Sequence, residues 1–217
     1  MQSLMFFMIQ DIIILSFFNG KEECFMPKQL EIEFKNLLTE EEFHRLADRF
    51  RVSQNDFFSH KNHYFDTPSF LLKEKKMALR IRETNNHFEL TLKQPYEKGL
   101  LETNQTLNSE EATMMLTSGM IPDGEVKSAL IQSSVPLSEL KCFGTLTTCR
   151  AEIPYKDGIL VLDKSWYLNT QDFELEYEVE NYDVGKEKFL SLLQQYGIPV
   201  RKTENKIKRF YNALMSK

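Results

Sequence analysis

The sequence has few cysteines, no excess of basic residues and no glycine-rich phosphate loop. Its three cysteines, Cys24, Cys142 and Cys149, are odd in number and lack the spacing of metal ligands, which indicates reduced thiols rather than a disulfide framework. The 27 Lys and Arg residues are outnumbered by 32 Asp and Glu residues, and the net charge of -5 argues against a nucleic-acid-binding surface. Any basic site must therefore be local, and any phosphate site must be built from side chains.

The chain also lacks a long apolar run of the kind that crosses a membrane. Residues 4–18 are apolar, but Gln10 and Asp11 interrupt them and no basic segment precedes them. A transmembrane helix needs about 20 apolar residues, so we expect a cytoplasmic protein with no membrane partner. A small hydrophobic anchor at the N-terminus is the alternative interpretation.

The composition changes at Met26 to that of an ordinary domain. The preceding residues 21–23, Lys-Glu-Glu, are compatible with the codons AAG, GAG and GAA, which contain a purine-rich ribosome-binding sequence. We therefore interpret residues 1–25 as a leader from a start codon assigned too early, and residues 26–217 as a single domain. The intact mass of the natively expressed protein tests this hypothesis, because the leader would be absent from it.

Eight segments alternate apolar and polar residues with the period of two that indicates β-strands. They are residues 30–35, 62–66, 78–83, 88–93, 100–107, 144–153, 159–167 and 172–180. Turn-forming residues such as Asn85-Asn86 and Lys156-Asp157-Gly158 separate neighbouring segments, which favours antiparallel pairing.

Helical periodicity occurs in residues 39–50, 109–116, 125–132, 184–196 and 204–214. The first of these opens with Thr39 and Glu42, which form the pattern of a capping box. With no repeat and no long linker, these elements predict one α+β domain.

Polar residues form ordered rows on one face of the predicted strands. Glu31, Glu33 and Lys35 alternate with apolar residues and so share a face. Comparable rows consist of Arg80 and Arg82, of Glu89, Thr91 and Lys93, and of Glu174, Glu176 and Glu178. One such row is typical of a solvated sheet, but three carboxylates on a late strand repel one another unless cations lie between them.

These rows together suit a site for a metal and a phosphate. Carboxylate oxygens bind hard cations such as Mg²⁺ or Mn²⁺, whereas Arg and Lys side chains bind phosphate oxygens. A sheet of eight strands can close into a barrel wide enough for one elongated small molecule. We therefore expect an antiparallel eight-stranded β-barrel tunnel whose interior is charged and whose apolar residues face helices packed on the outside.

The motifs resemble those of the CYTH superfamily, also called triphosphate tunnel metalloenzymes. Glu31, Glu33 and Lys35 are similar to the family's ExExK signature near the start of the domain. Further matches in the family's order are Tyr64-Phe65-Asp66-Thr67, Leu79-Arg80-Ile81-Arg82, Glu89 to Lys93, Arg150, Asp163, Glu174-Leu175-Glu176 and Lys206. The resemblance covers residues 28–212 and is greatest to small stand-alone bacterial members of the Bacillus group.

The resemblance also implies roles for individual residues. It implies catalytic roles for Glu31, Glu33 and Lys35, and Mg²⁺ or Mn²⁺ binding by Glu31, Glu33, Glu174, Glu176 and Glu178, with the register of the last three left open. It implies substrate binding by Lys35, Arg80, Arg82, Lys93, Arg150, Lys206 and Arg209. Many members have an arginine followed by an acid on the fifth strand, but here Glu102 follows Leu101 instead, which puts the grip on a nucleotide in doubt.

The activity implied by the resemblance is hydrolysis of a small-molecule triphosphate by a monomer or homodimer. Inorganic triphosphate is the preferred substrate, followed by thiamine triphosphate or a nucleoside triphosphate. An adenylate cyclase of the class IV type and a non-catalytic sensor of polyphosphate or a nucleotide stay open. We interpret His44, His60, His63 and His87 as surface or packing residues, and residues 73–76 as a solvated turn or an electrostatic entrance for anions.

Overall fold

The computed structural model describes residues 29–97 and 99–216, and the predicted leader of residues 1–25 lies outside them. The strands in this part of the chain are β1 (Gln29–Leu38), β2 (Phe58–Asp66), β3 (Ala78–Thr84), β4 (His87–Tyr96), β5 (Gly99–Leu107), β6 (Lys141–Tyr155), β7 (Gly158–Tyr167) and β8 (Thr170–Val179). The helices are α1 (Glu40–Arg49), α2 (Leu71–Glu74), α3 (Ser109–Ser118), α4 (Glu125–Gln132), α5 (Tyr182–Gln195) and α6 (Lys206–Met215).

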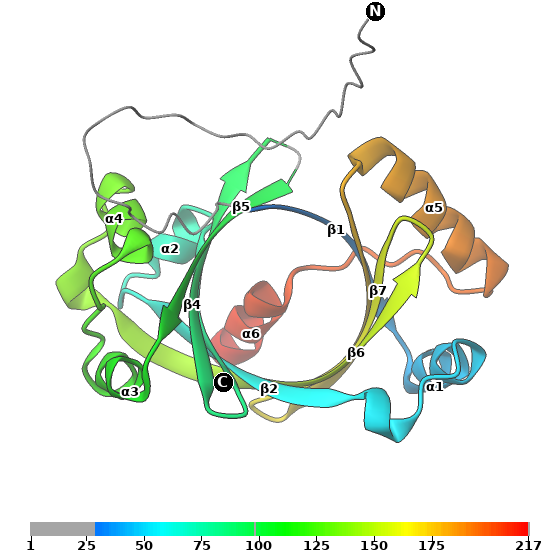
Figure 1. The fold of residues 1–217 in the computed structure, drawn as a ribbon, viewed down its shortest axis with the longest axis horizontal. Helices are drawn as coiled ribbons and strands as arrows, with labels where there is room; N and C mark the ends of the chain where they lie inside the picture. Colours follow the sequence, from blue (N-terminus) through cyan, green and yellow to red (C-terminus); the bar gives the residue numbers. More distant parts are fainter. Residues whose placement is uncertain (1–28, 98, 217) are drawn as a thin grey trace, which may run out of the picture.

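The strands form a closed barrel in the order β1-β5-β4-β3-β2-β6-β7-β8, and every pair of neighbours is antiparallel. Strand β1 closes the barrel, because residues 29–31 pair with β5 and residues 32–38 pair with β8. Figure 1 looks down the barrel, with α1 and α5 on one side and α2, α3 and α4 on the other. The predicted α+β fold, an eight-stranded antiparallel barrel with helices outside it, is confirmed.

The apolar residues of the strands point outward, against the helices. Leu79 and Leu90 of β3 and β4 are fully buried in one cluster with Leu130 of α4. A second cluster packs Leu175 of β8 with Leu46 of α1. These clusters place the hydrophobic core between the barrel wall and the helices. Burial of each of these leucines stabilises the folded state by about 1.5–3 kcal/mol. The alternate residues of the same strands are left to line the interior.

Helix α6 closes one end of the barrel. Its residues Phe210 and Tyr211 pack in a third cluster with Tyr64, Leu146 and Tyr167, which come from the inward-facing rows of β2, β6 and β7. In Figure 1, α6 is seen through the barrel. The interior is therefore an apolar plug at this end and a polar cavity beyond it.

Local signals account for most element boundaries. The predicted capping box is confirmed, because the Thr39 side chain accepts from the backbone N–H of Glu42 and the Glu42 side chain accepts from that of Thr39. The β3–β4 turn has φ values of 47° at Asn85 and 65° at Asn86, the left-handed conformation expected for these residues. No helix in the described ranges combines the length and the apolar character needed to cross a bilayer.

The prediction of a simple turn at residues 73–76 was incomplete, because Lys73 and Glu74 belong to α2. Asp66, at the end of β2, accepts from the backbone N–H groups of Leu72 at 2.8 Å and Lys73 at 3.0 Å. It also accepts from the Tyr211 hydroxyl at 2.6 Å. The carboxylate that caps α2 thus lies several residues before the helix in the sequence and also binds α6. A local sequence pattern does not reveal such a cap.

Candidate active site

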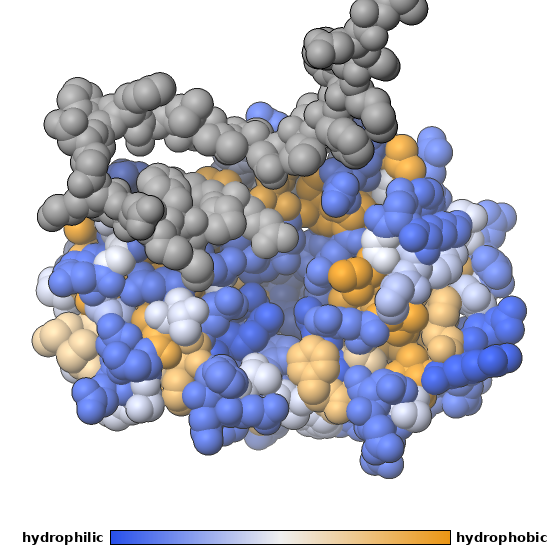
Figure 2. Space-filling view, in the orientation of Figure 1, coloured by the Kyte–Doolittle hydropathy of each residue, from blue (hydrophilic) through white to orange (hydrophobic). Residues whose placement is uncertain are grey.

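A cavity of about 1220 Å³ occupies the barrel, and charged side chains from both walls line it. Figure 2 shows hydrophilic residues gathered around the hollow at the centre of the barrel. Lys73 and Lys76, which are exposed, contribute to its lining from the segment between β2 and β3. Residues 73–76 are therefore exposed to solvent, and Lys73 and Lys76 also border the cavity. Their role as an electrostatic entrance for anions stays a prediction.

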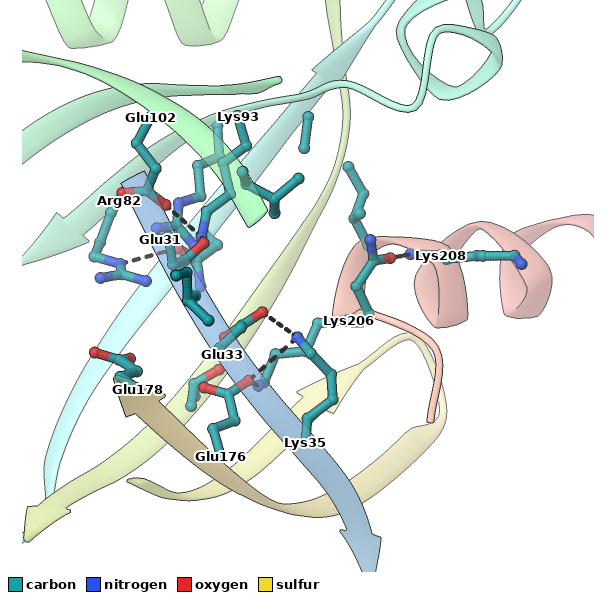
Figure 3. Close-up of a pocket in the computed structure, with 18 of the residues that line it drawn as sticks. Glu31, Glu33, Lys35, Arg82, Lys93, Glu102, Glu176, Glu178, Lys206 and Lys208 are labelled. Atoms are coloured by element: carbon teal, nitrogen blue, oxygen red, sulfur yellow. Dashed lines mark hydrogen bonds and ion pairs between the residues drawn. The ribbon is translucent and has the colours of Figure 1, made fainter. Parts of the chain in front are cut away.

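Glu31, Glu33 and Glu178 form what we call the carboxylate group. Their ligand atoms all lie within 4.8 Å of one another. Glu33 stands opposite Glu178 in the β1–β8 ladder, and Glu31 follows on the same face of β1. Lys93 donates to Glu31 at 2.5 Å and also pairs with Glu102, as Figure 3 shows. An oxygen-only set of this size suits Mg²⁺ or Mn²⁺, so these residues fit the predicted cation.

Burial and mutual repulsion disfavour the ionised forms of the acids in the carboxylate group. Burial raises the pKa of Glu31, and Glu33 and Glu102 raise it further although Lys93 opposes them. Burial also raises the pKa of Glu178 to about 7, with Glu176 adding to the shift and Arg150 opposing it. A divalent cation would remove this repulsion, because a nearby positive charge favours the ionised carboxylates.

Arg80 and Arg82 of β3, the arginine pair, stand on the opposite wall. Strands β3 and β2 lie across the closed barrel from β1 and β8. Within residues 29–97 and 99–216, no carboxylate lies within ion-pair distance of either guanidinium. The Arg80 Nε is buried and has no hydrogen-bond partner there, whereas the Arg82 Nε donates to Asn62 at 3.2 Å. The repulsion from Arg80, together with burial, lowers the pKa of Arg82 to about 10. Glu89, which stands opposite Arg82 in the β3–β4 ladder, offsets only part of this repulsion, so the pair is a positive site with no ion-pair partner among the described residues.

A third set of charges, the Lys206 cluster, is already neutralised by the chain itself. The Lys206 Nζ lies 2.5 Å from Glu174, 2.6 Å from Glu176 and 2.9 Å from Asp163. Arg150 donates to both oxygens of Asp163, at 2.8 and 2.7 Å, and to Glu176 at 2.8 Å. Glu174 and Glu176 are therefore held by cations of β6 and α6 and lie outside the carboxylate group.

The Lys206 cluster has a distinct electrostatic character. Although burial opposes it, Lys206 and Arg150 hold the pKa of Glu176 well below its usual range. Burial raises the pKa of Glu174 to about 7 even though Lys206 opposes the shift. Arg209 contacts Glu174 at 2.5 Å, and Lys35 lies 3.8 Å from Glu176, so both predicted substrate-binding side chains also face acids of β8.

The fold brings almost all predicted site residues into one cavity. The lining contains Glu31, Glu33, Lys35, Arg80, Arg82, Lys93, Arg150, Glu176, Glu178 and Lys206. Glu174 and Arg209 lie behind it, in contact with each other. The sequence left open which glutamates of β8 join Glu31 and Glu33, and in the structure the neighbour of these two residues is Glu178.

Sequence reasoning missed one inward-facing histidine. His60 was interpreted as a surface or packing residue, but it lines the cavity and is only 3% exposed. The reason is that β2 begins at Phe58 rather than at the predicted residue 62. Asn62 and Tyr64 share its face, so the alternation extended by one step would have found it. His63 instead contacts Thr145 and Glu83 outside the cavity lining.

The structure is therefore a closed β-barrel tunnel with carboxylates on one wall and arginines on the other. The CYTH domain model matches residues 29–211, so the chain belongs to the CYTH family. This membership confirms the resemblance drawn from the sequence motifs.

Individual relatives agree with this membership. The chain is 46% identical over 186 residues to the Bacillus subtilis protein "Putative triphosphatase YjbK", covering 86% of this chain and 96% of that protein. The crystal structure of bh2851 from Bacillus halodurans, described as "a putative adenylate cyclase", is 47% identical with a TM-score of 0.82, covering 85% of this chain and 98% of that one. HpAC1 from Hippeastrum, at 21% identity and a TM-score of 0.65, shares the fold over 85% of this chain and 95% of that one.

Proposed function

We propose that this protein is a divalent-metal-dependent triphosphatase that hydrolyses inorganic triphosphate inside its barrel. The observation that carries the proposal is the segregation of charge across the cavity. Glu31, Glu33 and Glu178 crowd together on one wall, while Arg80 and Arg82 face them without an ion-pair partner in the described ranges. A cation beside a chain of phosphates satisfies both walls at once. The name of the Bacillus subtilis relative supports the same activity.

Each residue has a defined part in this proposal. Glu31, Glu33 and Glu178 hold Mg²⁺ or Mn²⁺, which when bound polarises the phosphate oxygens. Arg80 and Arg82 grip the phosphate chain through bidentate hydrogen bonds. Lys35, Lys93 and Arg150 also lie on the cavity lining, where carboxylates of the chain share their charge. Lys206 and Arg209 hold Glu174 and Glu176 in place from α6, so they support the site without gripping the phosphate chain.

The reaction needs positioning and charge neutralisation more than an acid–base pair. A water oxygen forms a bond to the terminal phosphorus, the bridging P–O bond breaks, and diphosphate leaves with the electron pair of that bond. One proton of the water stays on the released phosphate and the other goes to the diphosphate. The arginine pair and Lys35 withdraw the charge that develops on the phosphate oxygens. Lys35 stays protonated throughout, because Glu33 and Glu176 raise its pKa in spite of burial.

The test is phosphate release from inorganic triphosphate with Mg²⁺ or Mn²⁺, for the wild type and for Glu33→Ala and Glu178→Gln. We expect metal-dependent release that falls at least about 100-fold in Glu33→Ala, because one metal ligand and its charge are lost. Glu83→Gln is the matched control, since Glu83 faces Lys61 and His63 outside the cavity lining. Equal rates in wild type and Glu33→Ala would remove the metal role.

Adenylate cyclisation is the second candidate, and one observation favours it. The cavity of about 1220 Å³ is larger than the roughly 300–1,000 Å³ of typical small-molecule sites, so it has room for a ligand larger than inorganic triphosphate. The Bacillus halodurans relative carries a cyclase name. The same assay with ATP, reading phosphate and cyclic AMP in parallel, separates the two activities. Tight binding of triphosphate without turnover would instead indicate a sensor.

A further inference from the structure

His60 is a buried polar side chain that the proposed mechanism does not use. It lies on β2, lines the cavity and is 3% exposed. Its Nδ1 is buried and has no hydrogen-bond partner among the described residues. Because an unsatisfied buried polar atom is costly, such an atom beside a binding cavity points to a partner supplied by a ligand.

The strand pairing places His60 on the wall of the arginine pair. It stands opposite Thr148 on β6, while Asn62, the next inward residue of β2, stands opposite Arg82. Phe58, the preceding inward residue, stands opposite Arg150. Arg82 and Arg150 are thus diagonal neighbours of His60, at about 7–8 Å between backbones, within reach of long side chains that share a ligand.

The imidazole is neutral in this position. Burial, together with repulsion from Arg82, Arg150 and Arg80, lowers the pKa of His60 to about 3 although Asp163 opposes the shift. A neutral imidazole offers one N–H donor and one acceptor. It can therefore donate to a phosphate oxygen without adding a further positive charge beside three arginines.

We propose that His60 is a substrate-binding residue whose imidazole hydrogen-bonds an oxygen of the phosphate chain gripped by Arg80 and Arg82. This inference rests on the proposed function and deepens it, because it names a neutral contact on the wall opposite the carboxylate group. Since that wall lies across the cavity from the metal ligands, His60 contributes to substrate affinity more than to the bond-breaking step.

The first experiment compares His60→Phe and His60→Gln with the wild type. Phenylalanine keeps a planar ring but has no hydrogen-bonding atom, whereas glutamine keeps a donor and an acceptor. A hydrogen bond to a charged group predicts a KM for inorganic triphosphate about 10- to 100-fold higher in His60→Phe with kcat nearly unchanged, and partial rescue in His60→Gln. The control is His63→Phe, because His63 lies on the same strand outside the cavity lining; its KM should equal that of the wild type.

The second experiment measures binding on the wild-type protein and uses a variant only for assignment. Protein labelled with ¹⁵N-histidine is titrated with inorganic triphosphate in metal-free buffer, and the imidazole nitrogens are followed by NMR. We expect the Nδ1 resonance of His60, assigned by its loss in His60→Gln, to move on binding while those of His44 and His63 stay in place.

The outcomes separate this inference from the proposed function. If the wild type binds inorganic triphosphate, but the His60 resonance does not move and His60→Phe binds equally well, the inference is wrong and the function stands. If the wild type neither binds nor hydrolyses inorganic triphosphate, both are overturned.

Discussion

Two arginines in the same cavity are predicted to have opposite effects on stability. Arg82 has no carboxylate partner in the described ranges and is repelled by Arg80, whereas Arg150 is bound by Asp163 and Glu176. Replacing each by methionine removes the charge and keeps much of the aliphatic volume. We expect Arg82→Met to stabilise the ligand-free protein and Arg150→Met to destabilise it.

The magnitudes follow from the surroundings of each side chain. Each tenfold change in an acid constant is worth about 1.4 kcal/mol, so a pKa of about 10 for Arg82 indicates roughly 3 kcal/mol of unfavourable free energy in its charged form. Losing the hydrogen bond to Asn62 offsets about 1–2 kcal/mol of that, which leaves a net gain of about 1 kcal/mol. Breaking a buried ion pair costs about 3–5 kcal/mol, and for Arg150 the lower end applies because Lys206 still contacts Asp163 and Glu176.

The assay is urea unfolding of the wild type and both variants in metal-free, phosphate-free buffer of low ionic strength. A change of pH is no substitute, because the lowered pKa of Arg82 means that its unfavourable charge persists at every pH below about 10. Titration with inorganic triphosphate should then stabilise the wild type but hardly stabilise Arg82→Met. If Arg82→Met loses as much unfolding free energy as Arg150→Met, the interpretation of the arginine pair as an anion site is refuted.

Four further predictions concern the metal ligands, the first helix and the plug. Because the pKa of Glu178 is raised to about 7, Mg²⁺ affinity measured by calorimetry should rise between roughly pH 6 and 8 in the wild type and lose this dependence in Glu178→Gln. Thr39→Ala should cost about 1 kcal/mol of unfolding free energy through the lost helix cap. The lowered pKa of Glu42 contributes stability above its unfolded value of 4.5 that is lost as the pH falls below it, so wild type and Glu42→Gln should converge in acid. Gly144→Leu should loosen α6 and speed its proteolysis, because even a Cβ at that position would lie 2.3 Å from the Phe210 ring.

The sequence pattern predicted the strands well because alternation is a local property of each segment. The rows of Glu31 and Glu33 and of Arg80 and Arg82 followed directly from it, and the number of strands together with their charged faces predicted closure into a barrel. What it could not supply was the stagger between strands. Whether Glu174 or Glu178 stands beside Glu33 depends on the β1–β8 register, which no single strand encodes.

The same limit explains what was missed elsewhere. His60 was overlooked because the first residues of β2 include Ser59 and Lys61 on the outer face, which weakens the alternation that marks a strand. Helix α2 was overlooked because Asp66, which accepts from its N–H groups, belongs to the preceding strand. The start of β2 and the cap of α2 therefore both depend on tertiary structure more than on the local sequence pattern.

The distribution of charge explains why only part of the cavity is available to a ligand. Around Lys206, the carboxylates of Asp163, Glu174 and Glu176 are matched by cations of the chain, so a phosphate entering there would have to displace existing ion pairs. The arginine pair offers an anion its unpaired guanidinium groups at no such cost. A triphosphate should therefore settle between the arginine pair and the carboxylate group, with the Lys206 cluster as a rigid floor. If so, Lys206→Met should reduce unfolding free energy more than it reduces triphosphate affinity, because removing the lysine leaves three buried carboxylates with fewer cations. Urea unfolding and calorimetry on that variant compare the two losses, and a large loss of affinity with unchanged stability would assign Lys206 directly to the substrate.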